Sequence, residues 1–113
     1  MSNLPQDGEV YNPFGRFFVA LTPEWLLERE DVSTACAQTF GRLMSCAGQA
    51  GFVSMSWRRI AKGMGLKPDQ AKRHCYELQD KHKVIEILPG IDGQPNVIRF
   101  RWLHEALTVT DEI

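Results

Sequence analysis

The sequence predicts an α+β fold that is mainly α and that ends in a β-hairpin. In residues 33–47, apolar residues recur at the spacing of a helix. Two shorter segments with helical patterns lie on either side of Met64-Gly65-Leu66. Two β-rich runs follow, at residues 83–88 and 96–102, and the segment between them is rich in Pro and Gly. The hydrophobic patterning therefore places helices first and an antiparallel pair of strands last.

The 113 residues, 43% of them hydrophobic and 24% charged, are enough for one modest core in a single globular domain. Residues 1–15 carry two Pro and two Gly among polar residues, so we expect a flexible N-terminal arm there. The domain then spans residues 16–107, and residues 108–113 form a C-terminal tail.

A short first helix is expected around Trp25, with the side chain of Thr22 as its cap. Pro23 suits the first helical position, and Glu24 suits the positive end of the helix dipole. The next helix, at residues 33–47, has one apolar stripe, formed by Cys36, Phe40, Leu43 and Ala47.

Gly41, inside this second helix, costs about 1 kcal/mol relative to Ala. Either another part of the chain approaches closely there, or the helix is only adequately stable. Residues 52–55 are short and apolar, which is typical of a small strand leading into the next helix.

Ser56 can cap a third helix, and Gly65 supplies the left-handed residue that ends it. The inward positions of this helix are Ile60, Ala61 and Met64. A fourth helix then opens at Pro68, with Asp69 in its first turn. Its buried face is formed by Ala71, Cys75 and Leu78. The turn between the two helices must be tight, as in a helix-turn-helix.

In the second β-rich run, Ile98, Phe100 and Trp102 share one face, and Arg99 and Arg101 share the other. We expect the first face to pack on the core and the second to form a cationic surface. The complete order of elements predicts a winged helix-turn-helix with a C-terminal β-hairpin wing.

A family resemblance depends on Ser56, Arg59-Ile60-Ala61, Met64-Gly65-Leu66, Ala71, Leu78 and Val84-Ile85. With these residues, the region from Ser33 to Ile87, about half the chain, resembles the helix-turn-helix domain of plasmid and phage replication initiators, replication organisers and related regulators. The resemblance implies that the second helix of the pair enters the major groove of DNA and that the wing touches the neighbouring backbone or minor groove. Lys67 and Gln70 replace the family's usual Ser or Thr, which predicts a weaker helix start, and His82 replaces a frequent Gly.

Charge is distributed unevenly along the chain, although the net charge is only −1. Residues 56–86 hold eight Lys or Arg against four Asp or Glu, a net charge of +4, whereas residues 1–33 have a net charge of −4. Such charge can simply be a solvated helical surface. Its coincidence with the predicted helix-turn-helix favours binding to double-stranded DNA.

Exposed residues of the second helix can reach base edges in a groove about 12 Å wide. Gln70 and Arg73 are the expected readers, since Gln pairs with adenine and Arg with guanine. The other expected DNA-binding residues, for phosphate contacts or stacking, are Arg58, Arg59, Lys62, Lys67, Lys72, Tyr76, Arg99 and Arg101.

One such surface spans only a few base pairs, so we expect a homodimer or repeated binding on DNA. Residues 102–107 or the first helix could supply the contact between copies. The alternative function is a protein-protein interaction module of the same fold, which docks through Phe14, Phe17, Trp25 and Leu107. Replication initiation, transcription regulation and plasmid partition remain open, because all three use this fold.

No sequence motif nominates a catalytic residue, a cofactor or a small-molecule substrate, so we expect a protein that is not an enzyme. Cys75 lies near His74 and His82, but paired metal-ligand spacing is missing and no metal site is expected. The three cysteines are interpreted as small core residues of a reducing compartment. The N-terminus has no signal-peptide pattern and no long apolar run occurs, so a cytoplasmic location without membrane contact is expected.

Overall fold

The computed structural model of the chain describes residue 4 and residues 6–10 and 21–102. These residues form an α+β fold of four helices and a three-stranded antiparallel sheet. In chain order the elements are α1 (Glu24–Leu27), α2 (Thr34–Ala47), β1 (Phe52–Met55), α3 (Trp57–Lys62), α4 (Pro68–Asp80), β2 (Ile85–Leu88) and β3 (Asn96–Phe100). None of these helices has the length and apolar character needed to cross a membrane.

The sheet has the strand order β1-β3-β2, so the last strand lies between the other two. Ile98 of β3 is paired with Val53 of β1 on one side and with Ile87 of β2 on the other, and all three side chains are buried. Because neighbouring residues of a strand alternate between faces, Arg99 lies on the outer face. The expected hairpin and the expected strand at residues 52–55 are confirmed.

The second strand of the hairpin is shorter than the sequence predicts. It ends at Phe100, and Trp102 is 61% exposed, so the prediction of a buried Trp102 is wrong. The backbone leaves the sheet at this point, and the indole meets the edge of Trp25 with 6.0 Å between ring centroids. Trp102 therefore covers α1 from outside.

The core lies between α2, α4 and the inner face of the sheet. The predicted stripe of α2 is buried at Cys36, Phe40 and Leu43, and Ser33 caps the helix by accepting a hydrogen bond from the Cys36 N–H at 3.2 Å. On α4, the predicted residues Ala71, Cys75 and Leu78 are fully buried. Each large aliphatic or aromatic side chain in this core stabilises the fold by about 1.5–3 kcal/mol.

The segment before α1 crosses α2 at Gly41, which is the close approach that the sequence raised as one possibility. A Cβ at residue 41 would collide with the Thr22 hydroxyl and lie 3.0 Å from the Leu21 carbonyl oxygen. Thr22 does not cap α1, contrary to the prediction, because its hydroxyl donates to the Ala37 carbonyl oxygen at 3.3 Å. Pro23 occupies the N-cap position without a side-chain hydrogen bond, and the helix begins one residue later.

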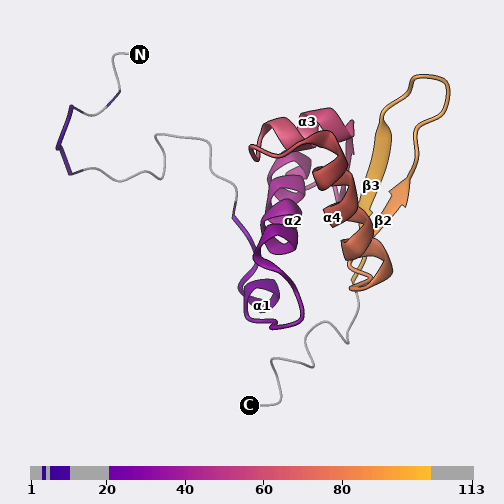
Figure 1. The fold of residues 1–113 in the computed structure, drawn as a ribbon, viewed down its shortest axis with the longest axis horizontal. Coiled ribbons are helices and arrows are strands. Elements are labelled where there is room, and N and C mark those ends of the chain that lie inside the picture. The colour runs from indigo at the N-terminus through magenta and orange to yellow at the C-terminus, as the bar shows by residue number, and fades with distance from the viewer. Residues whose placement is uncertain (1–3, 5, 11–20, 103–113) are drawn as a thin grey trace.

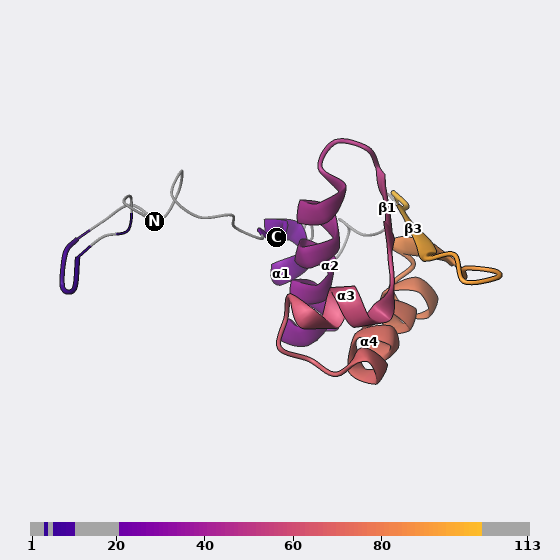
Figure 2. The ribbon, with the colours of Figure 1, turned by 90° about the horizontal axis from the view of Figure 1, so that it is seen from above.

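Figure 1 shows the arrangement of the elements in space. Helix α1 lies at the lower end of the domain and α3 at the upper end; α4 runs downward from α3, and the tip of the β2–β3 hairpin points upward beside it. Seen from above, α2 stands between α1 on one side and strands β1 and β3 on the other (Figure 2). The start of α4 and the hairpin tip therefore share one end of the molecule.

Two further predictions concern the chain ends and the cysteines. Of the arm expected at residues 1–15, the structure describes residue 4 and residues 6–10, where the Glu9 N–H donates to the Gln6 carbonyl oxygen at 2.9 Å. The tail expected at residues 108–113 lies outside the described residues. Cys36 and Cys75 are buried as expected, but Cys46 is exposed near the end of α2, so its prediction as a core residue is wrong.

Candidate nucleic-acid interface

A tight connection joins α3 to α4. Ser56 caps α3, as expected, by accepting a hydrogen bond from the Arg59 N–H at 3.2 Å. After α3 the chain turns back on itself, since the N–H groups of Met64 and Leu66 both donate to the Ala61 carbonyl oxygen, at 3.0 and 3.1 Å. Gly65 has φ +67°, a left-handed conformation that residues with a Cβ rarely adopt. This geometry holds the two helices against each other.

Gln70 contributes a hydrogen bond to the start of α4 that the sequence does not predict. The Gln70 side-chain oxygen accepts a hydrogen bond from the Lys67 N–H at 3.0 Å and thereby satisfies a backbone donor before the first turn. Pro68 opens the helix without an N–H of its own, and Asp69 lies in the first turn. Lys67 itself makes no side-chain hydrogen bond at the N-cap position, as the missing Ser or Thr predicts, and Gln70 supplies only the other half of a capping box.

Six cations surround this connection and the exposed side of α4. All six are exposed, and within the described residues none forms an ion pair. They are Arg58, Arg59, Lys62, Lys67, Lys72 and Arg73. The acidic residues of α1 and the segment after it lie at the other end of the domain, where α1 is found in Figure 1. The basic and acidic segments of the sequence are therefore also separated in the folded domain.

The two arginines at the end of the hairpin, unlike the six cations above, have an acidic partner. Nη1 of Arg99 and Nη1 of Arg101 lie 3.6 and 3.5 Å from the same oxygen of Glu86, so one carboxylate partly neutralises both. The Arg101 N–H also donates to the Val84 carbonyl oxygen, which fixes it beside the C-terminal end of α4. The hairpin tip at residues 89–95 contains no Lys or Arg. Arg99 and Arg101 therefore lie away from the hairpin tip, at the other end of the strands.

Two contacts fix α4 to its neighbours. The ring of Tyr76, a residue expected to contact DNA, is half-buried and lies 5.9 Å from the Trp57 ring of α3. On the other side of α4, the Gln79 side-chain oxygen accepts a hydrogen bond from the Ile87 N–H of β2 at 2.7 Å. Tyr76 thus contributes to the packing of α3 on α4, and Gln79 joins the hairpin to the same helix.

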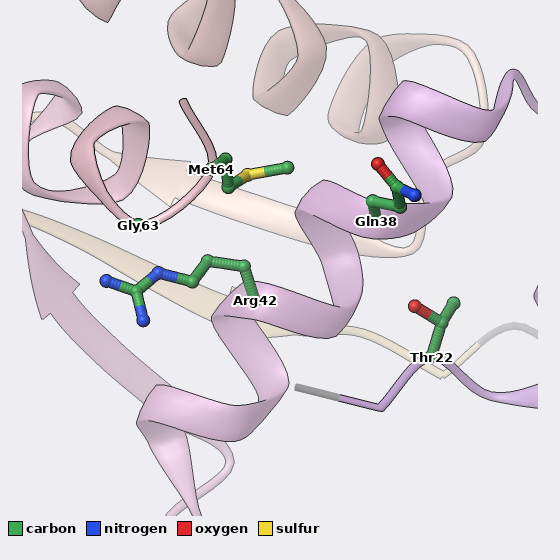
Figure 3. A pocket seen from close by; sticks show the side chains of 5 residues that line it. All are labelled: Thr22, Gln38, Arg42, Gly63 and Met64. Carbon is green, nitrogen blue, oxygen red and sulfur yellow. The ribbon is translucent and has the colours of Figure 1, made fainter. Parts of the chain in front are cut away.

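A pocket of about 240 Å³ lies where α2 faces the end of α3, and Figure 3 shows Thr22, Gln38, Arg42, Gly63 and Met64 around it. Arg42 extends from α2 toward Gly63, and its Nη2 donates to the Arg59 carbonyl oxygen at 3.5 Å. A cation near the carbonyl end of a helix stabilises it through the helix dipole. Sequence reasoning missed Arg42, because no local pattern links it to the end of α3, 17 residues away.

One buried and two half-buried titratable groups gather where α4 packs against the start of α2. The Cys36 thiol donates to Oε2 of Glu77 at 3.1 Å and lies 3.7 Å from Nδ1 of His74. Burial raises the pKa of Cys36 to about 11, and the hydrogen bond from this thiol lowers the pKa of Glu77. Sequence reasoning considered His74 only with Cys75 and His82, since Cys36 is 38 residues away in the chain.

The alternative function, protein docking, depends on four apolar residues, most of which lie outside the described part of the chain. Phe14, Phe17 and Leu107 lie outside the described residues. Trp25 is half-buried and meets the Phe40 ring edge-on, with 6.0 Å between centroids, so it is part of the packing around α1. No family model, curated protein or solved structure matches this chain.

Proposed function

We propose that the protein binds double-stranded DNA through α3 and α4, in the manner of a winged helix-turn-helix. The observation that carries this proposal is the group of six exposed cations around the α3–α4 connection, which form no ion pair with any residue that the structure describes. Cations that face water without a carboxylate partner are free to neutralise phosphates, and this electrostatic term is a large share of most DNA affinities. The fold supports the same interpretation, since a short helix, a tight turn, a longer helix and a hairpin follow in the order expected for this class.

In this mode α4 lies in the major groove with its exposed side toward the base edges. At 13 residues it is about 20 Å long, enough to follow the groove over a few base pairs. Arg73 is the first candidate for a base contact, because its guanidinium can form two parallel hydrogen bonds with guanine. Gln70 has its side-chain oxygen in the helix cap and keeps its NH₂ group for an acceptor on a base.

The remaining cations position the protein on the DNA backbone. Arg58, Arg59 and Lys62 of α3 and Lys67 of the connection contact phosphates on one side of the groove. Arg99 and Arg101 contact phosphates beside the C-terminal half of α4, after exchanging part of their interaction with Glu86. A single domain of this size contacts few base pairs, so two copies on a repeated or palindromic site complete the specificity. A role in plasmid or phage replication or in transcription regulation fits this activity.

The test is a titration of fluorescent duplex DNA with the wild-type chain and with a variant that carries Arg58→Ala and Lys62→Ala. At about 0.1 M salt each lost phosphate contact should weaken binding by roughly tenfold. Lys81→Ala is the matched control, because Lys81 already has a carboxylate partner, with Nζ 3.9 Å from Oε1 of Glu77. Equal affinities for wild type and the double variant would exclude this surface and favour the protein-docking alternative.

A further inference from the structure

Three potential metal ligands of different type meet between α2 and α4. The donor atoms of Cys36, His74 and Glu77 all lie within 4.8 Å of one another. Cys36 comes from the first turn of α2, whereas His74 and Glu77 are three residues apart on α4. Residues three apart on a helix lie on the same face, so both α4 side chains point toward the same place on α2.

The distance between the sulfur of Cys36 and the nitrogen of His74 is close to that of a tetrahedral zinc site. Zinc binds sulfur at about 2.3 Å and imidazole nitrogen at about 2.0–2.1 Å, which at a tetrahedral angle places the two ligand atoms about 3.5–3.6 Å apart. Sγ of Cys36 lies 3.7 Å from Nδ1 of His74 and 3.1 Å from Oε2 of Glu77. The second distance is that of a thiol-carboxylate hydrogen bond, and loss of the thiol proton would let these two atoms separate around an ion.

The charges around the three side chains also suit a divalent cation. A Cys36 thiolate and the Glu77 carboxylate together balance two positive charges. The other oxygen of Glu77, Oε1, faces Lys81 at 3.9 Å, so Oε2 is the one that faces the thiol. Cys36 lies in the first turn of α2, and the positive end of the helix dipole there partly offsets the burial that raises the pKa of the thiol. Binding of an ion releases the thiol proton to solvent.

The ligands are held on rigid elements and are still accessible. Cys36 is fully buried, and Cys75 and Leu78 of the facing helix α4 are fully buried as well. His74 and Glu77 are only half-buried, so one side of the cluster is open to solvent. Three protein ligands and an open fourth position are typical of zinc sites that keep a water or an exogenous ligand.

We propose that Cys36, His74 and Glu77 bind a divalent transition-metal ion, with Zn²⁺ as the best match, and that the ion joins α2 to α4. One thiolate and one imidazole select this class of ion over Mg²⁺ or Ca²⁺, which require several oxygen ligands. The three side chains lie where α4 packs against α2, and the proposal does not depend on the proposed DNA contacts.

The test uses the full chain without an affinity tag, first stripped of metal with a chelator. Addition of Zn²⁺ to about a hundred times its dissociation constant should raise the melting temperature by roughly 10 °C or more. Co²⁺ should give the visible absorption of a tetrahedral ion and a thiolate-to-cobalt charge-transfer band. Zn²⁺ should remove both signals by competition.

Cys36→Ser should abolish the charge-transfer band and weaken Zn²⁺ binding by at least about 100-fold, since a lost ligand costs more than a lost supporting contact. The matched control is Cys46→Ser, which removes an exposed thiol from the same helix and should change neither signal. Glu77→Gln and His74→Ala alter half-buried positions and provide variants that fold if Cys36→Ser does not. The proposal is overturned if wild type shows no cobalt spectrum or if the spectrum survives in all three ligand variants.

Discussion

Gln70 turns back toward the start of its own helix, where its side-chain oxygen accepts a hydrogen bond from the Lys67 N–H at 3.0 Å. The same residue has been assigned to a base contact from its position on α4. Both roles are compatible, because the oxygen serves the cap while the NH₂ group remains a donor. The cap also fixes the orientation of the side chain before any DNA is bound.

Gln70→Ala should therefore lower the stability of the free protein. Loss of a capping contact costs about 0.5–2 kcal/mol. Urea unfolding of the two proteins measures this difference, and Gln70→Glu serves as a control because Glu keeps the accepting oxygen. A Gln70→Ala variant as stable as wild type would show that the cap contributes nothing.

Arg73→Ala and Lys62→Ala should have different effects on DNA binding. The first removes a proposed base contact and should relax sequence preference by about 1–3 kcal/mol at one position, whereas the second should weaken binding to all sequences alike. Selection of sites from random DNA, followed by affinities on the selected and scrambled duplexes, separates the two effects. If both substitutions weaken binding to all sequences by the same factor, Arg73 does not contact a base.

The hairpin arginines should affect binding more than stability. Arg99 and Arg101 are about half exposed and share Glu86, and exposed ion pairs contribute about 0–1 kcal/mol. Replacing both with Ala should change the free energy of unfolding by less than about 1 kcal/mol, and the salt dependence of DNA binding should become shallower by roughly one to two units. Glu86→Gln should have the opposite effect on affinity because it frees both guanidinium groups.

Melting and binding must be measured on the same hairpin variants. A destabilised Arg99→Ala and Arg101→Ala double variant with unchanged DNA affinity would mean that these arginines serve the fold.

His82 should make the protein less stable in mild acid. Burial lowers its pKa below 6.5; Arg29 and Lys81 lower it further, while Asp31 and Glu77 raise it. Neither ring nitrogen has a hydrogen-bond partner among the described residues. The unfolded chain therefore takes up a proton before the folded one does, so the stability present above about pH 6.5 is lost as the pH falls toward the folded pKa.

Unfolding in urea at pH 7, 6 and 5, with chelator present, should show this loss, at no more than about 1.4 kcal/mol per pH unit. In His82→Phe the pH dependence in this range should be flatter. If the variant keeps the wild-type pH dependence, a titratable group other than His82 causes the loss of stability.

Local features of the fold could be predicted from the sequence because they depend on residues within a few positions of each other. The caps at Ser33 and Ser56, the left-handed turn at Gly65 and the buried face around Cys75 are of this kind. The hydrogen bond from Lys67 to Gln70 is also local, since the two residues are three apart, but the sequence pattern does not show in which direction the Gln70 side chain turns.

Contacts between distant segments could not be predicted in this way. Thr22 bonds to α2 rather than capping α1, because the chain crosses α2 at Gly41. The meeting of Cys36 with Glu77, 41 residues apart, depends on how α2 and α4 pack. The pairing of Glu86 with both hairpin arginines required the strand register, which the sequence alone left undetermined.

The salt dependence of duplex binding by the wild-type chain tests the proposed DNA surface most directly. Five of the six cations, all except Arg73, are proposed to neutralise phosphates; together they give a plot of log affinity against log salt with a slope of about −4.5, and partial engagement gives about −3. We expect a slope in this range and a loss of affinity by orders of magnitude between about 50 and 200 mM salt. A slope near zero, or no binding at low salt, would contradict the assignment of α3 and α4 to DNA.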